Sequence, residues 1–191
     1  MFKTILTPTD GSKHAAVAVT VASDLAAKYG ARLILLHVVA RDGADEGLAR
    51  LAELESVPTM TTVRRVEYLE ATPQGPVALP GGAQEDVDRE AAITQAAQSF
   101  LERTKDALRS GGVAEISVLV EHGEPADSIL EAARREHADA IVIGSRGLSD
   151  LKGVLVGSVS HKVAHRAGCV CITVTAQPGS PARSGNKSGR S

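Results

Sequence analysis

Aromatic residues are the scarcest class in this chain. Its 191 residues include two phenylalanines, two tyrosines and no tryptophan. Alanine, valine, leucine and isoleucine must therefore build the core, and no indole ring is available to stack on a nucleic-acid base. An excess of charge is also missing, because 21 basic and 23 acidic residues leave a net charge of −2. The chain thus lacks the basic surface that is typical of nucleic-acid-binding proteins.

Cysteine is nearly absent too. Cys169 and Cys171 stand two apart in an expected strand, so their side chains share one face and are poorly placed for a disulfide. We interpret both as packing residues rather than redox or metal ligands, because a free cysteine behaves as a small hydrophobe. No segment is long and apolar enough to cross a membrane, and no targeting segment is recognisable. These absences favour a cytoplasmic location.

What the chain does contain is an alternation of apolar runs and amphipathic segments. Short apolar runs indicate strands, and apolar residues at helical spacing indicate the helices between them. Strand, helix, strand at this length is a βαβ unit, so we predict an α/β fold with an open, doubly wound, five-stranded parallel sheet and helices on both faces. The expected strands are residues 2–7, 32–39, 116–120, 139–143 and 169–174, and the expected helices are residues 15–29, 85–110, 125–137 and 159–166.

Two segments interrupt this alternation. Residues 40–84 hold a possible short helix over residues 44–55 and then several prolines and glycines. So long a loop is uncommon in a compact domain unless it is functional or disordered. We interpret it as a poorly structured insertion in a single domain of residues 1–175, with a lid over the site as the alternative. Residues 176–191 offer no apolar cluster on which to fold and are expected to be a disordered tail.

The clearest chemical pattern follows the fourth strand. Gly144 ends an apolar run, Gly147 comes three residues later, and Gly157-Ser158 opens the last helix. Glycines at 144 and 147 let a backbone approach a bulky ligand with no Cβ in the way. Ser158 stands where an N-cap would stand, and free N–H groups at a helix start favour an anion. The pattern predicts a phosphate site; an ordinary βα connection with two turn glycines is the alternative.

A second motif is expected at the same edge of the sheet. Asp10 lies in the turn after the first strand, where aspartate is common for purely local reasons. In a doubly wound sheet, however, ligands bind at the carboxyl ends of the strands where the strand order reverses. The turns after strands one and four both lie there. We therefore expect Asp10 and the loop at residues 144–158 to face one crevice.

These motifs resemble those of a known family. The spacing Gly144-x2-Gly147-x9-Gly157-Ser158 resembles the ATP-binding signature of the universal stress protein family, G-x2-G-x9-G-S/T. Residues 5–12, ILTPTDGS, are similar to the family's first strand and acidic turn, and residues 169–174, CVCITV, to its last strand. The resemblance covers roughly residues 1–39 and 86–175.

The resemblance implies an ATP site in which Mg²⁺ or Mn²⁺ bridges the phosphates rather than sitting in a protein cage. Asp10 matches the family's acidic position and Val39 a position whose backbone meets the adenine. Whether Arg146 pairs with phosphate or lies in solvent stays open. The implied nucleotide contacts are Pro8, Thr9, Asp10, Val39, Gly144, Ser145, Arg146, Gly147, Gly157, Ser158 and Val159.

The resemblance also implies a symmetric homodimer through antiparallel last strands, residues 169–174. An apolar strand at a sheet edge favours such pairing. The implied function is a homodimeric, ATP-binding switch in a stress response, with at most slow ATP hydrolysis and an unidentified protein partner. The sequence shows no paired catalytic carboxylates, no Ser-His-Asp order and no activated cysteine. This fits a nucleotide-binding protein rather than an enzyme.

Two other functions remain open. One is a dimer that does not bind nucleotide, although the intact glycine pattern disfavours it. The other is an ATP-using enzyme of a related α/β family, such as an ATP pyrophosphatase, whose SGGxDS loop is replaced here by Thr9-Asp10-Gly11-Ser12. His161 and His165 have the four-residue spacing of some zinc sites but no HExxH glutamate between them, so we expect no metal there. His37 and His122 stand near strand ends without a partner that would make either a general base.

Overall fold

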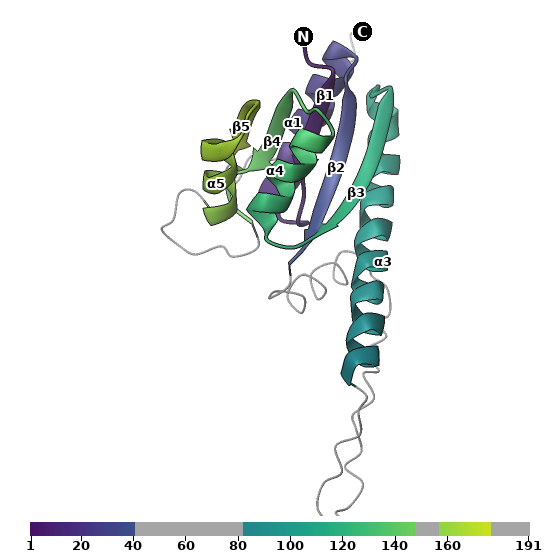
Figure 1. Cartoon of the computed structure of the whole chain (residues 1–191). Helices are drawn as coiled ribbons and strands as arrows, with labels where there is room; N and C mark the ends of the chain where they lie inside the picture. The colour runs from purple at the N-terminus through teal and green to yellow at the C-terminus, as the bar shows by residue number, and fades with distance from the viewer. Residues whose placement is uncertain (41–81, 148–156, 177–191) are drawn as a thin grey trace, which may run out of the picture.

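The computed structural model describes residues 1–40, 82–147 and 157–176. Within them, five parallel strands form one sheet in the order β3-β2-β1-β4-β5 (Figure 1). The chain adds β2 and β3 on one side of β1 and then crosses to add β4 and β5 on the other side. The predicted open, doubly wound sheet is thereby confirmed. The strands are β1 Thr4–Pro8, β2 Arg32–Val39, β3 Glu115–His122, β4 Ala140–Gly144 and β5 Val170–Val174.

Helices cover both faces of the sheet (Figure 1). Helices α1, Lys13–Tyr29, and α3, Gly82–Leu108, lie on one face, and α4, Pro125–Arg135, and α5, Ser158–Arg166, on the other. Side chains of a strand alternate between the two faces, so each strand contributes to two apolar clusters. Leu33 and Leu35 of β2 pack with α1, whereas Ile34 and Leu36 pack with α4. This double burial explains why the strands read as continuous apolar runs.

Local capping fixes where the helices begin. The Ser12 hydroxyl accepts a hydrogen bond from the Ala15 N–H at 3.2 Å, and α1 therefore starts at Lys13. A cap of this kind contributes about 1 kcal/mol. At α4 the Glu124 carboxylate accepts the Asp127 N–H at 2.9 Å. The turns that lead into both helices are thus held by their own side chains.

Helix α3 is the longest element. Its 27 residues extend for about 40 Å at 1.5 Å per residue, and Figure 1 shows it running past the carboxyl edge of the sheet. It begins at Gly82, three residues before the predicted helix start at residue 85. A 3₁₀ turn, Arg109–Gly111, and Gly112 at φ +84° end the helical stretch. The possible helix at residues 44–55, the lid and residues 177–191 of the tail lie outside the described residues.

Several predicted strand boundaries are wrong by one or two residues. Pro8 is the last residue of β1 rather than the residue that follows it, since a strand end can accommodate a missing N–H. Strand β3 extends to His122, two residues beyond its predicted end.

Cys169 precedes β5. Both cysteines are free and half-buried, and they pack against the apolar cluster on the face of the sheet that α4 covers. Burial raises the pKa of both thiols. Among the described helices, none is long and apolar enough to cross a membrane.

Candidate functional site

The strand order reverses between β1 and β4. Strands β1 and β4 share only two paired positions, the last being Leu6 with Ile141. Beyond that pair, the Thr7 hydroxyl donates to the Val142 carbonyl at 2.9 Å and ties the two strands by a side chain instead. The backbone pairing of the two strands ends there, and the loops that follow both strands lie at the carboxyl edge of the sheet. This is the place where open α/β sheets bind ligands.

Gly147 is the residue at which the two loops meet. A Cβ on Gly147 would lie 2.6 Å from Oδ2 of Asp10, so the carboxylate occupies the space that any side chain here would need. The other carboxylate oxygen, Oδ1, accepts the Ser12 N–H at 3.0 Å, which orients the group. The predicted meeting of the acidic turn with the glycine loop is confirmed. A contact of either residue with nucleotide stays a prediction.

At Gly144 a side chain is excluded by helix α1 rather than by Asp10. A Cβ there would lie 2.8 Å from the carbonyl carbon of His14 and 2.9 Å from the nitrogen of Ala15. The missing side chain lets the end of β4 pack against the first turn of α1. The space that we had assigned to a ligand at this position is filled by the helix. Only the backbone groups of Gly144 could touch a ligand.

Replacing Gly144 with alanine is expected to destabilise the fold by about 1–3 kcal/mol, because the contacts are with backbone that cannot yield cheaply. Urea denaturation would measure the loss. Gly111→Ala is the matched control, since a Cβ at Gly111 meets nothing within 4 Å, and it should change stability by less than about 0.5 kcal/mol. Equal stability of the two variants would contradict the packing role.

Ser145 ties three elements together. Its N–H donates to the Val174 carbonyl at 2.6 Å, and its carbonyl accepts the Gly157 N–H at 2.6 Å and the Ser160 hydroxyl at 2.8 Å. These bonds join the end of β4 to the end of β5 and to the start of α5. The Ser145 hydroxyl is buried and makes no hydrogen bond within the described parts of the chain. An unsatisfied buried hydroxyl beside a crevice suits a ligand oxygen.

The start of α5 corrects one sequence prediction. The N-cap is Gly157, in an extended conformation at φ −69° and ψ 154°, and Ser158 is the first helical residue. Ser158 was predicted as the cap, but the Gly157 carbonyl already accepts the His161 N–H at 3.0 Å. No side chain caps this helix. The first N–H groups of α5 therefore have no helix partner, which favours an anion.

Arg146 and Val159 flank this helix start without a clear ligand role. Arg146 is partly buried, and its Cα would lie 3.3 Å from a Cβ on Gly157, so the two ends of the glycine motif are close in space. Val159 packs at the edge of the α4-side core. Whether Arg146 pairs with phosphate stays open.

At the end of β2 the backbone groups of Val38 and Val39 point in opposite directions. The Leu36 carbonyl accepts the Thr9 N–H, and the Val39 carbonyl accepts the Gly123 N–H at 3.1 Å. Successive residues of a strand direct their backbone groups to opposite neighbours. Val38 therefore shares the direction of Leu36, toward the loop after β1, where β1 itself has already ended. The backbone groups of Val39 point toward β3, and its side chain packs with Ile93 of α3.

His37 is buried (7 % exposed) beneath α3, where its ring meets the Phe100 ring edge-on at 6.5 Å. Its Nδ1 lies 2.8 Å from the Thr9 carbonyl oxygen. A carbonyl only accepts, so Nδ1 carries the proton and donates. Burial lowers the pKa of His37 below the ordinary 6.5, although the Thr9 carbonyl and the Asp10 carboxylate both act to raise it. His37 is thus held in its neutral form.

Acidification is expected to destabilise the protein through His37. The unfolded chain binds this proton near pH 6.5, whereas the folded chain binds it only at lower pH. Unfolding therefore takes up a proton in that window, and stability falls as pH falls below 6.5. Urea midpoints at about pH 7.5 and about pH 5.5 should shift more in the wild type than in a His37→Asn variant. Equal shifts in the two proteins would refute this.

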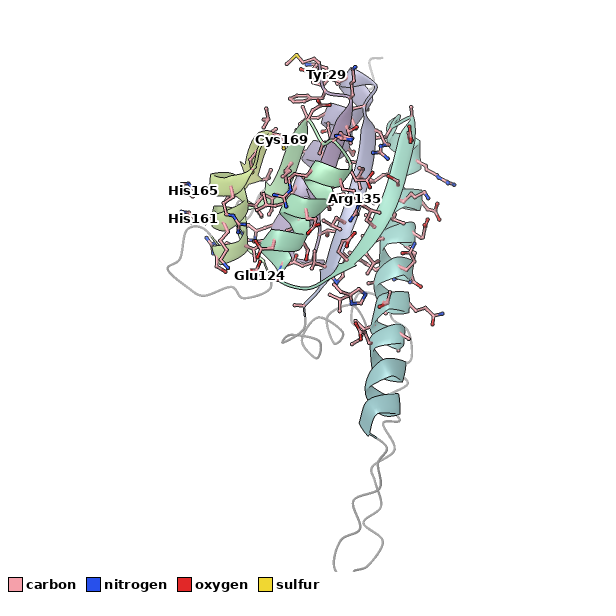
Figure 2. All side chains as sticks on the ribbon, in the orientation of Figure 1. Tyr29, Glu124, Arg135, His161, His165 and Cys169 are labelled. Carbon is pink, nitrogen blue, oxygen red and sulfur yellow. The ribbon has the colours of Figure 1, made fainter. Side chains whose placement is uncertain are left out.

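His161 and His165 lie on the outer side of α5, pointing away from the sheet (Figure 2). Their rings are stacked, with centroids 6.4 Å apart and planes 11° apart. Lys162 and Arg166 pair with Glu124 and Asp127 of α4 at 3.0 Å and 2.6 Å. In the described part of the chain, no three potential ligands cluster around a metal position.

Sequence reasoning missed three residues of this site. Ser160, the third residue of α5, is not part of the glycine pattern, although its hydroxyl donates to the Ser145 carbonyl at 2.8 Å. His37 interrupts the apolar run LILLHVV, and a histidine in a doubly covered strand needs a buried partner. That signal was available. The choice between Val38 and Val39 depends on strand register, which one sequence does not reveal.

Comparisons with known proteins agree with this architecture. A sequence model of the universal stress protein family matches residues 1–175. Universal stress protein YxiE of Bacillus subtilis is 30% identical over 174 residues, which cover 91% of this chain and 99% of that protein. A universal stress protein of Thermus aquaticus, from the QAH/OAS sulfhydrylase 3′ region, is 33% identical over 178 residues, with the same coverage of 91% and 99%.

Solved structures show the same fold at lower identity. UspA from Lactobacillus plantarum superposes with a TM-score of 0.65 at 20% identity, over 91% of this chain and 97% of that one. MJ0577 of Methanocaldococcus jannaschii gives 0.63 at 23% identity, over 94% and 99%. A universal stress protein solved in complex with cAMP gives 0.54 at 24%, over 91% and 97%. With the family model spanning the sheet, the acidic turn and the glycine loop, this chain belongs to the universal stress protein family.

Proposed function

We propose that this protein binds ATP in the crevice between the carboxyl ends of β1 and β4, and that occupancy serves as a regulatory signal in a stress response. The observation that most supports this is the contact of the Asp10 carboxylate with Gly147, which joins the two loops at the strand-order reversal. The related protein solved with cAMP shows that an adenine nucleotide binds to a member of this fold.

The crevice offers different groups to the two ends of the nucleotide. The uncapped start of α5, at Ser158 and Val159, the buried Ser145 hydroxyl and the backbone at Gly147 suit phosphate oxygens. The Asp10 carboxylate, which lies beside Gly147, and the backbone of Val38 are assigned to the nucleoside. Mg²⁺ or Mn²⁺ would then be held mainly by phosphate oxygens and water, as is usual for ions that accompany nucleotides.

The same arrangement argues against rapid hydrolysis. Fast phosphoryl transfer needs an oriented water, a base and charge stabilisation at the γ-phosphate. Asp10 is oriented by the Ser12 N–H and lies at the proposed nucleoside end, while His37 is buried and donates to Thr9. Neither group is placed to activate a water. We therefore assign the site to binding, with hydrolysis incidental.

Self-association is the second part of the proposal. Strand β5 is hydrogen-bonded to β4 on one side, and Val170 at its start is half exposed. The order of the described strands places β5 at an edge of the sheet, and such an edge pairs readily with another chain. We assign this edge to a symmetric homodimer with antiparallel β5 strands.

Mass spectrometry of nucleotide released from the denatured purified protein tests the binding proposal, together with calorimetry of nucleotide-free protein against ATP and GTP. We expect ATP to be released and to bind in preference to GTP, with turnover below about 1 s⁻¹. If no nucleotide is released and calorimetry detects no heat of binding, the nucleotide-independent dimer would be favoured. Turnover above about 1 s⁻¹ would instead favour an ATP-using enzyme.

A further inference from the structure

The Thr9 peptide is clamped by two consecutive residues of β2. The Leu36 carbonyl accepts the Thr9 N–H at 2.8 Å, and the His37 Nδ1–H donates to the Thr9 carbonyl at 2.8 Å. Thr9 is itself buried (6 % exposed). Its hydroxyl also accepts the Gly11 N–H, at a longer 3.4 Å. The turn after β1 is therefore fixed to β2 on both sides of one residue.

Asp10 follows Thr9 directly, so the hydrogen bonds that fix Thr9 also limit where the Asp10 backbone can lie. Rotation of the Thr9–Asp10 peptide would break the bond from His37 and would also change the direction in which the Asp10 side chain leaves the backbone. With the Thr9 carbonyl held, one carboxylate oxygen accepts the Ser12 N–H and the other occupies the space that a side chain at Gly147 would need. His37 does not line the glycine loop. It acts on that loop through the position of Asp10.

We propose that His37 is a positioning residue of the nucleotide site, which by donating Nδ1–H to the Thr9 carbonyl sets the place of the Asp10 carboxylate against Gly147. The inference rests on the proposed ATP site for its functional consequence and on the described contacts for its geometry. Neither the spacing of the glycine motif nor the acidic turn includes this histidine.

A purely structural role for His37 predicts that different substitutions are tolerated at position 37. The ring packs edge-on against Phe100, and phenylalanine would preserve that contact while losing the donor. Asparagine would lose ring packing but keep an N–H near the place of Nδ1. If His37 serves only to fill the core, phenylalanine is the better replacement. If it positions Asp10, asparagine is.

The test compares His37→Phe, His37→Asn and a control, His165→Phe, an exposed histidine in the last turn of α5. ATP affinity is measured by calorimetry on each folded full-length protein. We expect His37→Phe to weaken binding by about tenfold or more, and His37→Asn and His165→Phe to stay within about threefold. In an Asp10→Ala background, His37→Phe should have no further effect, because the two residues act as one unit.

A second readout is independent of nucleotide. Amide hydrogen exchange at Ser12, whose N–H is bonded to Asp10, should be faster in His37→Phe than in the wild type or in His37→Asn. If the wild-type protein binds no ATP, the proposed function fails, and Ser12 exchange alone decides the positioning role. Unchanged Ser12 protection in a folded His37→Phe protein would overturn the inference. So would an affinity loss of equal size in the presence and absence of the Asp10 carboxylate.

Discussion

A Gly147→Val protein is expected to fold normally and to show no measurable ATP binding. The new Cβ would lie 2.6 Å from the Asp10 carboxylate, so the carboxylate must move away or the glycine loop must shift. Either movement separates the two loops that the proposed site needs together. The clash is with the end of a side chain rather than with backbone, so we expect the cost in stability to stay within the 1–3 kcal/mol that is usual for overpacking.

Alanine at the same position separates the effect of the Cβ from that of added bulk. In the proposed site the Asp10 carboxylate accepts a hydrogen bond from the nucleoside, and a hydrogen bond to a charged group contributes about 1.5–3 kcal/mol. Displacing the carboxylate in Gly147→Ala is therefore expected to weaken ATP binding about 10- to 150-fold. Gly111→Ala should leave affinity unchanged, since that position faces open space far along the chain from both loops. A folded Gly147→Val protein with wild-type ATP affinity would falsify the proposed site.

A proline at position 173 is expected to turn a dimer into a folded monomer. The Val170 N–H donates to Asp139 and the Val174 carbonyl accepts from Ser145, so residues 170, 172 and 174 direct their backbone toward β4. The backbone groups of Cys171 and Thr173 must then point to the open edge. Thr173→Pro removes an outward N–H and places a ring there, which a monomer tolerates because proline is accommodated on sheet edges.

Two companion variants make this result specific. Ile172→Pro removes a donor from the β4–β5 ladder itself and should destabilise the monomer. Thr173→Val keeps the N–H and should remain a dimer. Light scattering at micromolar concentration reports the assembly state, and urea denaturation reports stability. A monomeric wild-type protein would contradict the dimer, while a dimeric Thr173→Pro protein would show that another surface is used.

Much of the fold could be predicted because it depends on patterns that are local in sequence. Apolar runs located all five strands. Ser12, Gly30 and Pro125 stand at helix ends, where serine, glycine and proline are common. Errors fell where a boundary depends on pairing. Strand β3 runs on to His122 because β2 offers a partner as far as Val39, and a sequence does not show how far a neighbouring strand continues.

The site was predictable in its chemistry but less so in its atomic roles. The glycine spacing and Asp10 indicated the correct edge of the sheet. The reasons for individual glycines were hidden, however, because Gly144 packs against α1 and Gly147 against Asp10, and both contacts join residues more than 100 positions apart. Strand register, which decides which backbone groups of β2 and β5 point toward a neighbouring strand, is likewise a property of the assembled sheet.

The Ser145 peptide is hydrogen-bonded both to the edge strand β5 and to the start of α5, which belongs to the proposed nucleotide site. Its N–H holds the last residue of β5 at 2.6 Å, and its carbonyl holds the first turn of α5 through Gly157 and Ser160. The loop that carries Gly147 therefore cannot shift at Ser145 unless the end of the edge strand follows or a short hydrogen bond breaks. In the proposed dimer, a ligand that moves this peptide would change the free energy of self-association, and by thermodynamic reciprocity self-association would change ligand affinity by the same factor.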